Sequence, residues 1–275
     1  MGLSIVIPSK SAGNLRECLA AIRARDPLLH ITVVDDGVVW GHEDATLYRQ
    51  LMRVVPGVHP FIYARNCNIG IQATYPDDVL LLNDDALLET PEGFTAMWKL
   101  AKEHPEIGVM GAAIDYCGTP EQLLDRSNLR RMRQGKSTGL RELHLMVVFA
   151  CVIITRRIID QIGLLDERFS VNAGGPGKRG YGCEDDDYCW RVRQAGLKLA
   201  VYDGCLVNHT KLKSTFRNDL EHPWDVQAHE ALFEEKWGRH PRSYERDIAD
   251  SRMVPRGTPI STRADNRRVP GQVRS

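Results

Sequence analysis

The sequence predicts an α/β protein whose central sheet is mostly parallel and flanked by helices. Short aliphatic and β-branched runs, typical of buried strands, occur at residues 3–8, 31–34 and 79–82. Between them lie segments whose apolar residues recur at helical spacing, such as residues 15–25. Strands that alternate with helices form βαβ units, in which successive strands run parallel.

Composition and charge fit one large α/β domain or two small ones, with no general affinity for polyanions. The chain has 275 residues, of which 43% are hydrophobic and 26% charged, so it can bury a sizeable core. The 36 Lys and Arg residues balance the 36 Asp and Glu residues. Because no net field attracts nucleic acid, we expect no nucleic-acid partner.

The cysteines and apolar runs indicate a cytoplasmic protein. Seven Cys include no C-x-x-C pair, which argues for a reducing compartment and against a disulfide framework or a zinc site. Met1 leads directly into an apolar run, without the basic region of a secretory signal. The longest apolar run, residues 145–154, is far below the roughly 20 residues that span a bilayer. Peripheral association with the inner face of a membrane stays open.

Hydrophobic periodicity and turn residues define the expected elements. In the first half we expect strands at 3–8, 31–34, 61–63 and 79–82, and helices at 15–25, 44–55, 72–75 and 90–103. In the second half we expect strands at 108–114, 200–202 and 206–207, and helices around 130–133 and at 156–163, 184–196 and 222–238. We expect one domain over residues 1–245, with a boundary between halves near residue 115, and a disordered Arg- and Pro-rich tail over 246–275.

Polar residues follow each of the four strands expected in the first half. They are Ser9, the pair Asp35 and Asp36, Arg65, and the pair Asp84 and Asp85. Any one of these ends could be a simple turn. In an open parallel sheet, however, ligands bind in the crevice outside the carboxyl ends of the strands. Four polar ends together therefore predict a ligand crevice.

The run Asn83-Asp84-Asp85 after the fourth strand predicts a metal site. Adjacent buried carboxylates repel unless a cation neutralises them, and Mg²⁺ or Mn²⁺ is the usual partner of oxygen ligands beside a phosphate. A helix N-cap is the alternative, since Asn and Asp favour that position. The chain has neither G-x-G-x-x-G after the first strand nor a P-loop, so bound phosphates would need a metal.

A second acidic run, Glu184 to Asp187, opens an expected helix after a glycine-rich loop at residues 172–182. Acidic residues at a helix start complement its dipole, but four exceed that need. A carboxylate presented rigidly beneath a mobile loop suits a general base. Farther on, His209 follows a strand; a lone His is commonly structural, yet neutral imidazole is a good Mn²⁺ ligand.

Taken in order, these features resemble the family 2 glycosyltransferases of GT-A fold. The set comprises a strand ending in Pro8, a strand ending in Asp35-Asp36, Asn83-Asp84-Asp85, Gly182-Cys183-Glu184-Asp185, and a strand followed by His209. The resemblance covers roughly residues 3–240, including residues 163–169 and 233–238. It implies a GT-A-like fold and a nucleotide-diphosphate sugar as donor.

The resemblance also implies roles for individual residues. Asp35 and Asp36, with Pro8 and Ser9, would line the pocket for the nucleotide, and Arg65 and Asn68 match a region that contacts it. Asn83-Asp84-Asp85 is similar to the family's D-x-D motif, with Asn83 in place of the first Asp. Asp85 and His209 would hold Mn²⁺ or Mg²⁺. Asp185 matches the catalytic base, with Asp186 as the alternative in this acidic run.

The implied reaction is inverting transfer of a sugar, from a UDP-sugar, to a hydroxyl of a glycan, lipid-linked or protein acceptor. Lys178 or Arg179 could close over the diphosphate. Two other readings stay open: a sugar-1-phosphate nucleotidyltransferase, which should have a glycine-rich loop after its first strand, and a degenerate binding module, suggested by Asn83. The sequence specifies neither the sugar, the acceptor nor the oligomeric state.

Overall fold

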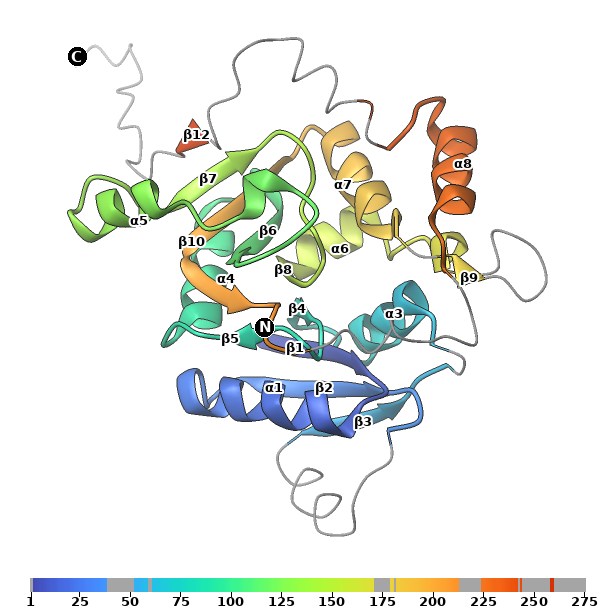
Figure 1. Ribbon diagram of the computed structural model, residues 1–275, viewed down its shortest axis with the longest axis horizontal. Helices are drawn as coiled ribbons and strands as arrows, with labels where there is room; N and C mark the ends of the chain where they lie inside the picture. Colours follow the sequence, from blue (N-terminus) through green and yellow to red (C-terminus); the bar gives the residue numbers. More distant parts are fainter. Residues whose placement is uncertain are drawn as a thin grey trace, which may run out of the picture.

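The computed structural model describes residues 2–38, 52–58, 61–170, 179–180, 182–212, 224–241, 243 and 258–259. These residues form a ten-stranded sheet with helices on both faces (Figure 1). Its strands are β1 (Leu3–Ser9), β2 (His30–Asp35), β3 (Arg53–Pro56), β4 (Asp78–Leu82), β5 (Leu87–Leu88), β6 (Ile107–Ile114), β7 (Leu140–Leu143), β8 (Cys151–Ile154), β10 (Lys198–Asn208) and β12 (Thr258–Pro259). A separate two-stranded sheet pairs β9 (Arg179–Gly180) with β11 (Trp224–Asp225).

The large sheet is mixed, in the order β12-β7-β10-β6-β8-β4-β1-β2-β3, with β5 also paired to β10. Strands β1 to β4 pair in parallel, and β10 pairs in parallel with β6. Strand β8 runs antiparallel between β4 and β6 and so joins the two parallel groups. The predicted α/β class with a central sheet and flanking helices is confirmed, and parallel pairing is concentrated in the N-terminal half.

The described residues contain seven α-helices and two short 3₁₀ segments. The α-helices are α1 (Ala12–Arg25), α3 (Tyr63–Ala73), α4 (Gly93–Glu103), α5 (Arg126–Arg133), α6 (Arg156–Ile162), α7 (Glu184–Gln194) and α8 (Val226–Trp237). The 3₁₀ segments are η1 (Pro120–Gln122) and η2 (Glu167–Ser170). The helices expected at 15–25, 90–103, 130–133, 156–163, 184–196 and 222–238 are confirmed, with ends that differ by a few residues.

Alternating strand residues supply two apolar faces, each covered by its own helices. On one face, α1 and α4 pack against residues such as Ile5 and Leu80. On the other, α3, α6 and α7 pack against residues such as Val6 and Leu81. Helix α3 lies so close to β1 that a Cβ at Gly70 would stand 2.2 Å from a Val6 methyl carbon, so only glycine fits there. This packing fixes the strand ends that carry the polar residues.

Two expectations for residues 44–63 are wrong in the described part. Residues 53–56 form β3 instead of the end of a helix, because they pair with β2 at the sheet edge. Residues 61–63 lead into α3 instead of forming a strand, so Arg65 lies on a helix and not at a strand end. Short apolar runs do not distinguish a strand from a helix, and at residues 53–56 the pairing with β2 determines the strand. Residues 44–51 of the expected helix lie outside the described residues.

The polar segment 117–141 is fixed to the sheet by a buried ion pair. Arg141 on β7 donates two hydrogen bonds, each of 2.8 Å, to the carboxylate of Asp203 on β10. Both side chains are almost fully buried, at 1% and 0% exposed. Arg141 also donates to the carbonyl oxygens of Glu121 and Leu123, and Asn128 on α5 donates to Asp203. One buried network thus holds η1, α5, β7 and β10 together.

The strand pieces expected at 200–202 and 206–207 belong to one strand, β10, whose pairing with β6 shifts register between Tyr202 and Leu206. Within the described residues, no helix combines the length and the apolar character that crossing a bilayer requires. Of the expected C-terminal tail, only residues 258–259 are described, as β12 paired with β7.

Candidate functional site

The carboxyl ends of β1, β2 and β4 meet at one edge of the sheet. Ser9 stands opposite Asp35 in the parallel register of β1 and β2, and Pro8 stands opposite Val34. The Ser9 hydroxyl donates a 2.7 Å hydrogen bond to Oδ2 of Asp84, which follows β4. The backbone N–H of Asp36 donates to the Ser9 carbonyl at 2.9 Å. Three predicted polar ends therefore lie side by side.

Asp35 organises the turn after β2. Its Oδ1 accepts a 2.7 Å hydrogen bond from the backbone N–H of Val38, and its carbonyl oxygen accepts one of 2.7 Å from Gly57 after β3. The Asp35 side chain is partly exposed, whereas Asp36 is 2% exposed. The two adjacent acids therefore differ: Asp35 has access to solvent at the sheet edge, and Asp36 is packed behind it.

Asp85 and His209 are in direct contact although 124 positions separate them in sequence. The His209 Nε2 atom lies 3.2 Å from Oδ1 of Asp85. Strand β5 pairs with the end of β10, with Asn208 opposite Leu87, and this register places the two side chains together. The N–H of His209 also donates to Asp115 at 2.7 Å. Burial lowers the pKa of His209, but its hydrogen bond to Asp85 and that residue's charge outweigh burial and raise it.

The oxygens beside this pair suit a hard cation. Oδ1 of Asn83 and Oδ1 of Asp84 are buried and have no hydrogen-bond partner among the described residues. Buried acceptors without a partner are costly, and a divalent cation or a bound ligand would satisfy them. The described part of the chain holds no group of three or more His, Cys, Asp or Glu side chains arranged as a metal site. A metal-binding role for Asp85 and His209 stays a prediction, and these two side chains alone would not complete the coordination of a divalent cation.

Asp84 carries a charge that the fold penalises. Burial, opposed by the hydrogen bond from Ser9 and reinforced by the charge of Asp85, raises the pKa of Asp84 to about 7. In an unfolded chain the pKa of Asp is about 3.9. Between these values the folded protein binds more protons at this site than the unfolded chain, so the free energy of unfolding falls as pH rises.

Replacing Asp84 by Asn should therefore increase the free energy of unfolding at pH 8 in EDTA, because the buried charge is removed. The gain should shrink as pH falls through the interval between the two pKa values and vanish at pH 3. Urea unfolding at several pH values measures this, with the partly exposed Asp35→Asn as the matched control. A pH-independent change in Asp84→Asn would contradict the assignment.

Arg65 and Asn68 on α3 both contact the segment that precedes and begins η2. Arg65 Nε donates to Oε2 of Glu167 at 2.7 Å. The Asn68 amide donates to Glu167 at 3.0 Å and to the Leu165 carbonyl at 2.9 Å, and accepts from the Leu165 N–H at 2.9 Å. These bonds fix both side chains against the second half of the chain. A contact with the nucleotide stays a prediction for both.

The four acids at the start of α7 have different environments. Glu184 is buried, and burial together with the charge of Asp185 raises its pKa well above the usual range. Asp187 is fully buried and is bonded to Arg191 and to residues of α8. Asp185 and Asp186 are partly exposed, and Oδ1 of Asp185 accepts the Asp186 N–H at 3.0 Å. The two predicted base candidates are thus the two acids of the run that retain access to solvent.

Residues 149–150 connect the two acidic regions. The N–H of Asn83 donates to the Ala150 carbonyl at 2.9 Å, and the Tyr63 hydroxyl donates to the Phe149 carbonyl at 2.6 Å. The Tyr63 hydroxyl has a raised pKa, through burial first and then through neighbouring groups that include Glu184. The Phe149 ring also packs against that of Tyr188 on α7, with centroids 5.7 Å apart, so residues 149–150 contact α3, α7 and Asn83.

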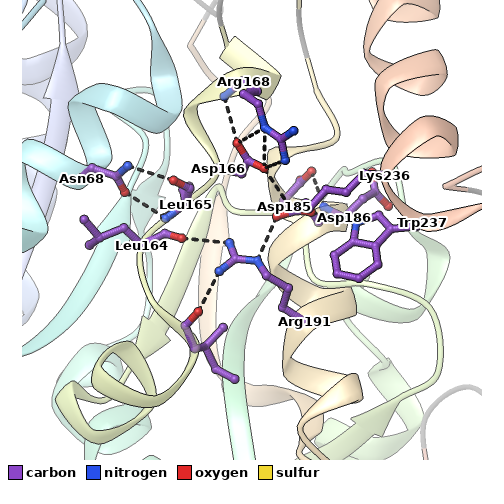
Figure 2. Close-up of polar contacts among 12 residues, drawn as sticks. Asn68, Leu164, Leu165, Asp166, Arg168, Asp185, Asp186, Arg191, Lys236 and Trp237 are labelled. Atoms are coloured by element: carbon purple, nitrogen blue, oxygen red, sulfur yellow. Dashed lines mark hydrogen bonds and ion pairs between the residues drawn. The ribbon is translucent and has the colours of Figure 1, made fainter.

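Sequence reasoning missed the contacts that two residues of α8 make near the start of α7. Lys236 contacts Asp166 (Figure 2). It also contacts Asp187, which accepts a hydrogen bond from the indole N–H of Trp237. The i,i+4 spacing of Asp187 and Arg191 was the available signal that this acid has a structural partner. Lys178 lies outside the described residues, and Arg179 is described only as part of β9.

Comparison with solved structures finds glycosyltransferases. GalNAc-T7 with UDP, GalNAc and Mn²⁺ is 16% identical, with a TM-score of 0.62 over 94% of this chain and 52% of that one. The mannosyltransferase PcManGT of Pyrobaculum calidifontis, with GDP-Man and Mn²⁺, is 16% identical, with a TM-score of 0.54 over 78% and 58%. TarS 1–349 of S. aureus is 14% identical, with a TM-score of 0.54 over 76% and 60%. At these identities the likeness establishes the GT-A fold alone.

Comparison of sequences gives one curated relative and a family match. The relative is the uncharacterized protein y4gI of Sinorhizobium fredii (strain NBRC 101917 / NGR234), 27% identical over 221 residues. The aligned region is 70% of this chain but 23% of that protein. The family model described as Glycosyl transferase family 2 matches residues 4–163. Because that match spans more than half of the 275 residues of this chain, the chain belongs to glycosyl transferase family 2.

Proposed function

We propose that this chain is an inverting glycosyltransferase that moves a sugar from a nucleoside-diphosphate donor to an acceptor hydroxyl. Family membership supports the reaction class. The observation that carries the proposal is the contact of Asp85 with His209, 3.2 Å apart, beside two buried oxygens that have no hydrogen-bond partner in the described part of the chain. Parts of the sequence that lie far apart in the chain meet there, at the edge of the sheet where ligands bind in open α/β folds, and we assign them to one metal site.

The donor nucleotide would lie along the ends of β1, β2 and β4. Pro8, Ser9, Asp35 and Asp36 would face the nucleoside, and Asn83 and Asp84 the diphosphate. Arg65 and Asn68 would contribute from α3. We favour a UDP-sugar as the donor. One similar solved structure contains UDP and another contains GDP-Man, so the identity of the nucleobase is the finer part of the proposal.

Asp85 and His209 would hold a divalent cation, Mn²⁺ or Mg²⁺, with the remaining ligands coming from the donor and water. Two of the solved relatives are complexes with Mn²⁺. When bound, the cation would act as a Lewis acid that neutralises the charge of the departing diphosphate. His209 must be neutral to serve as a ligand, so the ion would compete with a proton for Nε2.

Asp185 would act as the general base, with Asp186 as the alternative. The acceptor oxygen forms a bond to the anomeric carbon, the bond from that carbon to the diphosphate oxygen breaks, and the diphosphate leaves with the electron pair. The acceptor proton passes to the Asp185 carboxylate. Attack opposite the leaving group inverts the anomeric configuration.

A thermal-shift screen tests the donor site. UDP, GDP and their sugar conjugates should raise the melting temperature in the presence of Mn²⁺, because a ligand that binds only the folded state adds RT ln(1 + [L]/Kd) to its stability. EDTA should abolish both this shift and sugar transfer. Asp85→Ala and His209→Ala should each lose the Mn²⁺-dependent part, whereas Lys198→Met, at a surface pair remote from this edge, should not.

Full transfer in EDTA would reject the metal assignment. Release of pyrophosphate from UTP and a sugar 1-phosphate would favour the nucleotidyltransferase reading, and binding without hydrolysis or transfer of any donor would favour a binding module.

We further assign donor binding to about residues 1–115 and the acceptor site and general base to about residues 116–245. The acceptor would be a glycan, a lipid-linked group or a protein. A cytoplasmic location remains part of the proposal.

A further inference from the structure

Lys236 on α8 forms the centre of a compact group of charged side chains next to the start of α7 (Figure 2). Its Nζ lies 2.6 Å from Oδ1 of Asp187 and 2.8 Å from Oδ2 of Asp166. Oδ1 of Asp187 also accepts the Trp237 indole N–H at 2.8 Å, and Oδ2 accepts Arg191 Nε at 2.9 Å. We name these five residues the Lys236 cluster. Asp187 is 0% exposed, so its charge depends on these partners.

Helix α8 contacts the start of α7 at a second point. The Nδ1 atom of the buried His229 lies 2.7 Å from the carbonyl oxygen of Gly182, just before α7 begins. His229 packs edge-on against Phe169, with ring centroids 6.0 Å apart, and Phe169 packs against Phe233. One end of α8 thus contacts Gly182, two residues before α7, while the other end, through Lys236, contacts the first turn of α7.

The Lys236 cluster is also bonded to the donor half of the chain. Asp166 contacts Lys236, while the next residue, Glu167, accepts hydrogen bonds from Arg65 and Asn68 on α3. Arg191 adds hydrogen bonds of 2.9 Å to the carbonyl oxygens of Ile162 and Leu164. Continuous polar contacts therefore run from α3, through residues 164–167, to the first turn of α7.

Helical geometry connects this cluster to the proposed base. Successive residues of an α-helix are rotated by about 100°. Asp187 and Asp185 are two positions apart and so project from nearly opposite sides of α7. Fixing Asp187 against Lys236 therefore fixes the rotation of the first turn, and with it the direction in which the Asp185 carboxylate points.

We propose that Lys236 is a positioning residue for the general base: it holds Asp187 and Asp166 together and thereby sets Asp185 in register with the donor half. This rests on the proposed function. A buried ion pair is commonly replaceable by apolar residues without loss of stability, so stability alone does not account for these charges. A misplacement of about 1 Å in a catalytic constellation costs up to about 10²-fold in rate.

The test compares Lys236→Met, which keeps the length of the side chain but removes the charge, with Lys236→Arg and the control Lys198→Met. Lys198 forms an exposed pair with Glu142 at the other end of the sheet. Lys236→Met should lower kcat about 10²-fold with the donor KM unchanged. Lys236→Arg should restore most of kcat, and Lys198→Met should match the unmodified protein.

A second readout does not depend on activity. Amide hydrogen exchange in the first turn of α7, at residues 185–188, should accelerate in Lys236→Met while β1 and β4 stay protected. Equal kcat in Lys236→Met and the unmodified enzyme would overturn the positioning role and leave the proposed function standing. A rise in the donor KM as large as the fall in kcat would do the same. Absence of transfer by the unmodified protein with any donor would instead reject the proposed function. Unchanged exchange would overturn the positioning role on structural grounds alone.

Discussion

Replacement of Asp185 by Asn is expected to lower the rate of sugar transfer about 10²- to 10⁴-fold, the range that positioned general bases contribute. Asn keeps the size and the hydrogen-bonding oxygen of the side chain but cannot take the acceptor proton. Among the four acids that open α7, Glu184 and Asp187 are buried, and Asp187 is committed to Arg191 and α8. Asp185 and Asp186 are the partly exposed pair.

Steady-state kinetics with saturating acceptor, together with donor titration, checks this prediction. Donor affinity should be unchanged in Asp185→Asn, because the first turn of α7 is not part of the proposed nucleotide site. Asp186→Asn is the discriminating variant, since the two residues are adjacent and similarly exposed. A collapse of kcat in Asp186→Asn alone would move the role to Asp186. Normal kcat in both would exclude this helix as the source of the base.

Replacement of Arg141 by Met should decrease the free energy of unfolding by about 3–5 kcal/mol, the usual consequence of leaving one member of a buried ion pair without its partner. Asp203 would retain the hydrogen bond from Asn128 but lose two charge-assisted bonds of 2.8 Å. The carbonyl oxygens of Glu121 and Leu123 would also lose a donor. Urea unfolding, monitored by circular dichroism, measures the change.

Lys198→Met is the control, because its ion pair with Glu142 is exposed and such pairs contribute about 0–1 kcal/mol. The double variant Arg141→Met/Asp203→Leu should recover part of the lost stability, since no charge is then left buried without its partner. If Arg141→Met and Lys198→Met lost equal stability, the Arg141–Asp203 pair would not be the anchor of residues 117–141. A loss in the double variant equal to the sum of the two single losses would show that the two side chains act independently.

Local sequence patterns predicted the elements whose pattern was long or unambiguous. The helical spacing of Leu15, Cys18, Leu19 and Ile22 identified α1, and the apolar run before Asn83 identified β4. The same reasoning failed at residues 53–63. There the apolar runs are short, and a strand at 53–56 forms because β2 offers an unpaired edge. A partner that is distant in sequence decided what local propensity left ambiguous.

The candidate site divides in the same way. Sequence placed Ser9, Asp35 and Asp84 at strand ends, and parallel pairing then brought them to one edge as expected. The contact of Asp85 with His209 rested on family resemblance alone, because it requires β5 to pair antiparallel with β10. The family match itself ends at residue 163, before α7 and His209.

By itself the sequence determined the α/β class, most helices and the polar strand ends, since these depend on periodicity and on residue types that are neighbours in the chain. Only the tertiary structure decided which acids of the run 184–187 are buried, paired or partly exposed. It also decided that Lys236, far along the chain, contacts Asp166 and Asp187. The physical reason is that burial and charge pairing depend on what packs against a side chain, and the partners of Asp187 come from α8 and from the next turn of α7.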